Sequence, residues 1–395
     1  MKKVGTYVRR WMLGGAIVLI AMSMRPIITS IGPLLDVLKQ SLHLSNAAVT
    51  SLTAVPIIAM GLFASLAPWM ERTFGMKRSI QVLLLLLLGA SAVRYVAFGW
   101  TELLVTSLVG GIAIAVLGPL LSSYVRTYYE KQFDRMIGWY SFGVGFGAML
   151  SASATPALYE WGGLPFALAI WAVIPFAALI SWQLGQPVGK REVAHGDVSS
   201  NGRSPWRSKE AWLYLLFFGV QSAIFFTVMT WFIPLLTKQG YSLIEAGSWM
   251  TLLTATQIVC NLMYPSFAAS LSNRVIGTYV VLSMSLVGFA LLLVENVYAT
   301  GGGTMLLGLS LGALFPIALT YPLETTTVGE ANEWTAMMQT GGFVLAGIAP
   351  VVVGWSVDVV GSDRFIYPLL MAGTVVLVGI VWKIDQLRLQ LEKVG

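Results

Sequence analysis

Residues 11–38 read WMLGGAIVLIAMSMRPIITSIGPLLDVL, an apolar run in which Arg25 and Asp36 are the only charged residues. At a rise of about 1.5 Å per residue, a helix of this length is about 42 Å long and crosses a hydrocarbon core about 30 Å thick. Arg25 lies about 16 Å before Asp36 on such a helix, within the core. A charge at this depth costs at least a few kcal/mol and is first interpreted as part of a functional site.

The composition of the whole chain extends this interpretation. Hydrophobic residues make up 56% of the 395 residues and charged residues only 11%, which excludes a soluble globular protein. We therefore expect an all-α membrane protein. The single cysteine, Cys260, excludes intramolecular disulfides and a cysteine-based metal cage, and we expect neither a metal nor a cofactor.

Apolar stretches long enough to cross a bilayer recur along the chain. The twelve predicted spans are residues 11–37, 46–70, 79–99, 102–125, 136–158, 164–184, 211–236, 243–268, 275–294, 301–322, 333–357 and 364–383. Most lysines and arginines then fall on one side, so the positive-inside rule predicts a multi-pass protein of the cell membrane with both termini in the cytoplasm. The same bias accounts for the net charge of +6, and we expect no nucleic-acid partner.

The two halves of the chain are related in sequence. Residues 185–210 are polar and rich in turn-forming residues, which predicts a cytoplasmic linker between residues 1–184 and 211–395, each with six spans. A shift of 201 positions places residues 33–54 over 234–255 with nine identities in 22 positions, more than chance gives for apolar sequence. Parallel repeats of this kind occur in transporters whose two bundles rock around a site at the membrane midplane.

Several motifs together resemble those of one known family. They are RPIITSIGPLL (25–35), LTAVP (52–56), GLFA (61–64), WFIP (231–234), EAG (245–247), MQTGG (338–342) and AP (349–350). The chain resembles the cyanate and 2-nitroimidazole porter family of the major facilitator superfamily, which implies twelve transmembrane helices in two six-helix bundles and transport by alternating access. Two features depart from the superfamily pattern. Residues 71–78 are offset by one position from the usual loop motif, which puts conventional gating there in doubt. The usual arginine is absent around residues 108–111, which argues against standard proton-antiport machinery.

Arg25 has no counterpart in the second half, because the same shift aligns it with Phe226, whereas Thr29 aligns with Thr230. No acidic residue or histidine falls at the centre of a predicted span. We therefore predict an anion site in which Arg25 supplies the charge, Thr29 and Ser30 supply hydroxyls, and the other half supplies neutral donors. The further candidate substrate contacts are polar side chains at middle depth and aromatic side chains suited to a cavity wall, namely Tyr124, Gln221, Thr227, Gln257, Tyr321 and Gln339.

Arg25 and Arg94, which both lie inside predicted spans, also have structural interpretations. Pro26 predicts a helix break beside Arg25, at which the guanidinium would hold free backbone carbonyls. Arg94 lies near the outer end of the third span, where we expect it to snorkel or to pair with Glu102.

The sequence thus favours a secondary transporter of a small anionic or polar solute, such as a cyanate-like anion, a nitroheterocycle or a small carboxylate. One alternative is a multidrug efflux transporter for lipophilic compounds, which would be expected to carry a mid-membrane acid. Another is a sensor or scaffold without transport. An enzyme is disfavoured because no nucleophile, acid and base cluster at one depth. The predicted partners are a small-molecule substrate and the lipid bilayer, and the predicted active form is a monomer.

Overall fold

The computed structural model describes residues 14–96, 99–129, 132–185, 204–270, 274–326 and 328–392. All regular secondary structure in these ranges is helical, which confirms the predicted all-α class. The α-helices that follow the first one are α2 (Pro26–Thr29), α3 (Leu35–Ser41), α4 (Asn46–Phe63), α5 (Ala67–Phe74), α6 (Met76–Val93), α7 (Trp100–Tyr128), α8 (Phe133–Ala169), α9 (Val173–Gly185), α10 (Lys209–Lys238), α11 (Leu243–Ser270), α12 (Arg274–Leu292), α13 (Val297–Thr325), α14 (Val328–Val360) and α15 (Ile366–Glu392). Short 3-10 turns occur at Gly32–Leu34, Ala64–Leu66, Ile170–Ala172 and Pro205–Arg207.

The long helices coincide with the predicted membrane spans. Within the described ranges, 10 helices are long and apolar enough to cross a membrane, beginning with Gly14–Ser41. One of them, Arg135–Leu184, carries two predicted spans that meet at Gly163, whose φ of 76° is a conformation that glycine adopts readily. The 28-residue helix α11 covers the predicted eighth span. Each of the twelve predicted spans therefore overlaps a described helix.

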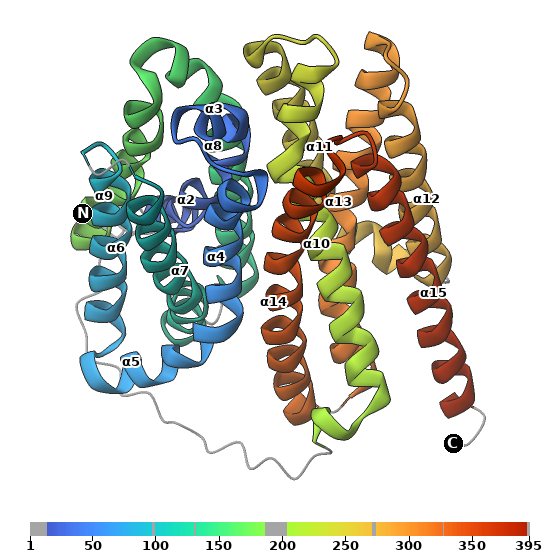
Figure 1. Cartoon of the computed structure of the whole chain (residues 1–395). Coiled ribbons are helices and arrows are strands. Elements are labelled where there is room, and N and C mark those ends of the chain that lie inside the picture. Colours follow the sequence, from blue (N-terminus) through green and yellow to red (C-terminus); the bar gives the residue numbers. More distant parts are fainter. Residues whose placement is uncertain are drawn as a thin grey trace. The chain divides into compact units, whose positions relative to one another are not determined.

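The chain forms two compact units, each a bundle of helices (Figure 1). Unit 1 comprises Met1–Leu44 and Val49–Gly196, and unit 2 comprises Ser45–Ala48 and Asp197–Gly395. The first turn of α4 belongs to unit 2, where the carboxylate of Asp358 accepts hydrogen bonds from the backbone nitrogens of Asn46 (3.0 Å) and Ala47 (2.9 Å).

In unit 1, glycines let α8 pack closely against the first helix. A Cβ at Gly143 would lie 2.6 Å from the Val18 carbonyl oxygen, and a Cβ at Gly147 would lie 2.4 Å from the Met22 carbonyl oxygen. Any larger residue would therefore collide with the backbone of the first helix. Gly143 and Gly147 are one turn apart on α8, so they bring one face of this helix against the residues that immediately precede Arg25.

Unit 2 uses glycine in the same way. Helix α10 packs mainly against α14, and α13 packs against both α11 and α12. A Cβ at Gly219 of α10 would lie 3.4 Å from the Cα of Gly342 in α14. On α13, a Cβ at Gly312 would lie 2.4 Å from the Gln257 carbonyl oxygen of α11. Small residues at such crossings are typical of helix packing in membranes.

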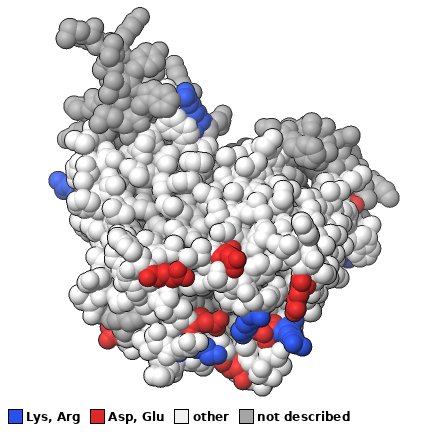
Figure 2. Space-filling view, turned by 90° about the horizontal axis from the view of Figure 1, so that it is seen from above, with Lys and Arg blue, Asp and Glu red and all other residues white. Residues whose placement is uncertain are grey.

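The outer faces of the helices are largely apolar, as expected of helices that contact lipid. Leu85, Val105 and Val280 are each more than half exposed. Figure 2 looks onto the helix ends that are at the top of Figure 1 and shows acidic and basic side chains among uncharged surface. Glu102 and Glu245 are exposed in the first turns of α7 and α11.

Candidate functional site

The first helix is broken at Arg25. Helical residues end at Ser23, and Arg25 caps the short helix α2 with φ −104° and ψ −38°. Pro26 causes this break because it has no N–H to donate to the Met22 carbonyl, which instead accepts a 3.4 Å hydrogen bond from the Arg25 backbone nitrogen. The structure therefore confirms that the helix breaks beside Arg25.

The Arg25 guanidinium keeps a free hydrogen-bond donor at this break. Its Nη1 atom is buried and has no hydrogen-bond partner among the described residues. The titratable side chain near it is Tyr140 of α8, and no described carboxylate pairs with it. Arg25 is thus a half-buried cation with an unused buried donor, which is the state that an anion would stabilise.

The two hydroxyl residues that follow Arg25 differ in availability. The Thr29 hydroxyl donates to the Arg25 carbonyl at 2.9 Å and lies 2.5 Å from the Ser151 hydroxyl of α8. Since Thr29 gives its one proton to this carbonyl, Ser151 donates to Thr29, and the Ser151 hydroxyl also lies 2.8 Å from the Gly147 carbonyl oxygen. The Ser30 hydroxyl is fully buried and has no partner among the described residues. Thr29 therefore fixes α2 onto α8, whereas Ser30 retains a free donor.

Tyr140 joins this group from α8, and Gly118 of α7 leaves room for it. A Cβ at Gly118 would lie 3.3 Å from both the Tyr140 hydroxyl and the terminal carbon of Met24. Tyr140 is three residues before Gly143, so it lies near the face of α8 that packs against the first helix.

The structure contradicts the expectation that Arg94 snorkels to the interface or pairs with Glu102. Its side chain is only 1% exposed, so it does not snorkel to an interface. Its Nε donates to the Thr106 hydroxyl (3.1 Å), its Nη2 donates to the Ser107 hydroxyl (2.8 Å), and its Nη1 donates to the Ile27 carbonyl (3.2 Å). Glu102 is exposed, with its carboxylate against Gly99 at the start of α7. The Arg94 guanidinium therefore donates to three neutral acceptors, which are two hydroxyls of α7 and one backbone carbonyl of α2.

Comparison with known proteins identifies the fold family. The profile of the Major Facilitator Superfamily matches residues 11–302. The chain belongs to the Major Facilitator Superfamily. It is 31% identical to the 2-nitroimidazole transporter of Escherichia coli (strain K12) over 383 residues, which covers 92% of this chain and 94% of that protein. It is 29% identical to the cyanate transport protein CynX of the same organism over 339 residues, covering 85% and 87% of the two chains.

A solved structure shows the same fold. A mutant of the nucleoside transporter NupG superposes with a TM-score of 0.76 at 14% identity, covering 94% of this chain and 99% of that one. The two-bundle fold implied by the sequence resemblance is therefore confirmed as a Major Facilitator fold. The chain is accordingly a membrane transporter and not an enzyme.

Unit 2 of this Major Facilitator protein carries the neutral candidates. Gln221 and Thr227 of α10 are 2% and 1% exposed, and the Gln221 amide nitrogen donates to the Ser222 hydroxyl at 2.6 Å. Gln257 of α11 and Gln339 of α14 are half-buried. All four side chains remain candidates for substrate contact.

The two tyrosine candidates belong to separate aromatic clusters. In unit 1, the Tyr124 ring packs 4.8 Å from the Trp182 ring and 4.7 Å from the Tyr128 ring. In unit 2, Tyr321 stacks on Tyr214 with ring centroids 5.5 Å apart and planes 7° apart. Both rings fill space between helices in the structure.

Helix α10 repeats one of the hydrogen bonds found beside Arg25. The Thr230 hydroxyl donates to the Phe226 carbonyl at 2.8 Å, which reproduces the bond from Thr29 to the Arg25 carbonyl. Helix α10 is nevertheless continuous over 30 residues, because Thr227 occupies the position equivalent to Pro26 and keeps its backbone N–H. The charged break is therefore a feature of unit 1 that α10 does not share.

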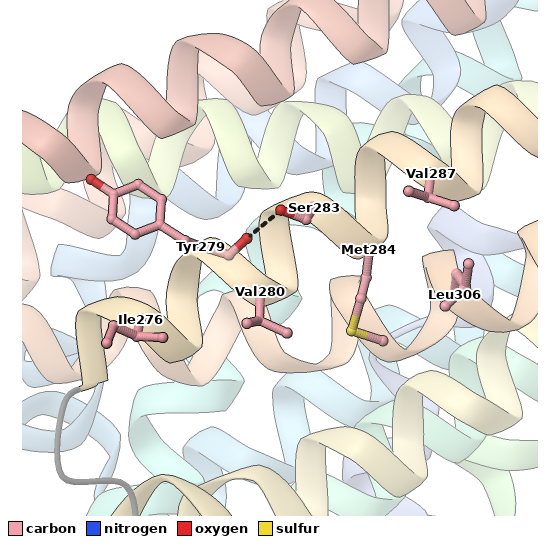
Figure 3. A pocket seen from close by; sticks show the side chains of 7 residues that line it. All are labelled: Ile276, Tyr279, Val280, Ser283, Met284, Val287 and Leu306. Atoms are coloured by element: carbon pink, nitrogen blue, oxygen red, sulfur yellow. Dashed lines mark hydrogen bonds between the residues drawn. The ribbon is translucent and has the colours of Figure 1, made fainter.

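An apolar groove on unit 2 lies apart from these residues (Figure 3). It is lined by Ile276, Tyr279, Val280, Ser283, Met284 and Val287 of α12 and by Leu306 of α13. The Ser283 hydroxyl donates to the Tyr279 carbonyl at 2.9 Å (Figure 3). Because five of its seven lining residues are aliphatic or methionine, the groove suits acyl chains rather than a polar solute.

Proposed function

We propose that this transporter moves a small anion or a strongly polar, electron-rich solute, and that Arg25 is the charge that binds it. The observation that carries the proposal is the unpartnered Nη1 of Arg25, buried at a helix break with no described carboxylate beside it. The names of the two relatives support the substrate class, since one is a cyanate transport protein and the other a 2-nitroimidazole transporter. Cyanate, a nitroheterocycle and a small carboxylate all present oxygen or nitrogen acceptors of the kind that a guanidinium binds.

The energetics favour an anion over a lipophilic cation. A buried arginine without a counter-ion is stabilised by any anion that reaches it, because a charge-assisted hydrogen bond in a low-dielectric site is about twice as strong as a neutral one. A lipophilic cation would instead be repelled by the same charge. Ser30 and Tyr140 are the unit 1 side chains best placed to add neutral donors. Gln221, Thr227, Gln257 and Gln339 are proposed to supply donors from unit 2, and Tyr124 and Tyr321 to form walls.

The topology is also part of the proposal. We place both termini on the cytoplasmic side of the cell membrane, with the transporter acting as a monomer. The support is the predicted excess of Lys and Arg on the side of the termini. Labelling of cysteines introduced at Lys209 and at Glu245, with a reagent that does not cross membranes, tests the sidedness, since only the second should react in intact cells.

The direct test of the function is anion-dependent stabilisation of the purified protein. Cyanate, nitrate, formate, acetate and 2-nitroimidazole are titrated in a thermal-shift assay, in which a ligand at 100 times its Kd adds about 2.7 kcal/mol to stability. We expect at least one of these probes to raise the Tm of the wild type, Arg25→Ala to abolish the effect, and Arg25→Lys to retain part of it. Uptake of the same probe into proteoliposomes should follow the same order. Binding and uptake that survive Arg25→Ala unchanged would refute the proposal.

A further inference from the structure

The strongest unused feature is Arg94, a second buried guanidinium in unit 1. Arginine is an expensive choice for a site at which all three hydrogen-bond acceptors are neutral, because its charge must be desolvated without a described carboxylate to compensate. A neutral side chain could satisfy Thr106 and Ser107 of α7 equally well. The partner that distinguishes Arg94 is therefore the third one, the backbone carbonyl of Ile27.

The Ile27 carbonyl needs a donor because of the way α2 ends. In a continuous helix it would accept from the backbone nitrogen of Ile31. Here the chain tightens after Thr29, and the Ile31 nitrogen donates to the Ile28 carbonyl instead, at 3.4 Å. A backbone carbonyl without a partner is strongly disfavoured in a membrane interior. Arg94 supplies the missing donor from 67 residues away in the sequence.

The direction of this contact is fixed by α7. The Thr106 hydroxyl donates its own proton to the Leu103 carbonyl at 2.9 Å, so it can only accept from Arg94. With Nε and Nη2 held by two adjacent residues of one helix, the planar guanidinium has one orientation, and its Nη1 points at Ile27. Arg94 therefore joins α7 rigidly to α2.

Helix α2 is only four residues long, and Arg25 caps it. Its two fixed points are the Ile27 carbonyl, held by Arg94, and the Thr29 hydroxyl, held against Ser151. Such a short turn moves as one piece, so these contacts determine where the Arg25 side chain points. The task that the sequence suggested for Arg25, holding a free carbonyl at the break, is performed by Arg94, and this leaves the Arg25 guanidinium available.

We propose that Arg94 is a positioning residue, which orients Arg25 toward the substrate by holding the Ile27 carbonyl. This inference rests on the proposed anion-binding role of Arg25. It places Arg94 outside the set of side chains that touch the substrate. It also explains why an arginine rather than a neutral donor occupies the position, since three rigidly arranged N–H groups are needed to connect two helices in one orientation.

The test combines binding with a readout that needs no ligand. Cyanate dissociation constants are measured for the wild type, Arg94→Met, Arg25→Lys and the double variant. We expect Arg94→Met to weaken binding about tenfold in the wild type and less than twofold in Arg25→Lys, because the oriented contact is already lost there. Arg94→Lys should recover part of the loss, since it keeps one donor for Ile27. Gly89→Ala is the control, because it changes α6 five residues before Arg94 at a position where a Cβ meets nothing within 4 Å, and it should change binding less than twofold.

The second readout is the reaction rate of a thiol at position 25 with a soluble maleimide, in Arg25→Cys combined with Cys260→Ser. Adding Arg94→Met should change this rate at least fivefold, and adding Gly89→Ala should not. A rate that Arg94→Met leaves unchanged overturns the positioning role, whatever the binding data show. An equal loss of Tm in both Arg25 backgrounds, with unchanged cyanate affinity, also overturns it and indicates a purely structural role. If Arg25→Ala binds cyanate as the wild type does, the proposed function fails, while the thiol rate still decides whether Arg94 orients position 25.

Discussion

Gly147→Ala tests how closely the site depends on the contact between α8 and the first helix. The added Cβ would lie 2.4 Å from the Met22 carbonyl oxygen and 2.8 Å from the Met22 Cα, which are both backbone atoms. Carbon and oxygen in non-bonded contact normally lie at least about 3.3 Å apart, so one helix must move by about 0.9 Å. Met22 is three residues before Arg25, and binding groups must be held within about 0.5 Å to remain effective.

We therefore expect Gly147→Ala to weaken anion binding at least about tenfold, or about 1.4 kcal/mol. The free energy of unfolding should fall by about 0–2 kcal/mol, because overpacking costs about 1–3 kcal/mol but alanine is favoured over glycine in a helix by about 1 kcal/mol. The assay is the anion titration of Tm described above, after size-exclusion chromatography to select folded protein. Gly138→Ala is the matched control, because it makes the same change on the same helix where a Cβ meets nothing within 4 Å. Equal affinities of the two variants would refute the reasoning.

Two further substitutions address the break and its surroundings. Pro26→Thr copies the residue at the equivalent position of α10 and restores a backbone N–H that can donate to the Met22 carbonyl. We expect it to give a continuous helix that binds anions at least about tenfold more weakly, with no loss of Tm. An unchanged affinity would show that the break is irrelevant to binding. Gly118→Ala places a Cβ 3.3 Å from the flexible ends of Met24 and Tyr140, so we expect the same Tm as the wild type but about threefold weaker binding, measured in the same titration. A wild-type affinity in Gly118→Ala would remove Tyr140 from the site.

The fold was accessible from the sequence because membrane helices depend on a simple pattern. Long apolar runs, the basic side of the membrane and a 201-residue repeat together predicted an all-α, two-bundle transporter, and the described helices and the family match agree with it. The break at Pro26 was also predictable, since the loss of one N–H is a local property. What one residue does to its own backbone can be inferred without knowing its neighbours.

The contacts between helices were less accessible. Arg94 was expected to reach the interface or Glu102, because sequence distance made Glu102 its nearest charge. The acceptors it found are two hydroxyls of α7 and a carbonyl 67 residues earlier. Likewise, Thr29 was predicted to offer its hydroxyl to the substrate, but in the structure that hydroxyl meets Ser151, which lies 122 residues away. A backbone carbonyl carries no residue-specific signal, so its need for a donor becomes visible only when the helix geometry is known.

The repeat shows how little sequence is needed to turn a structural helix into a charged site. Thr29 and Thr230 make the same bond to the carbonyl four residues earlier, so the two halves share the geometry of this turn. The differences that change charge and backbone donors are at two adjacent positions, where Arg25 and Pro26 align with Phe226 and Thr227. Proline opens the helix and arginine places a charge at the opening, and neither change alone gives a cation with a free buried donor at a helix break. Because the chain also tightens after Thr29 and leaves the Ile27 carbonyl without its helical donor, the short helix needs a further residue to hold that carbonyl, and Arg94 meets this requirement.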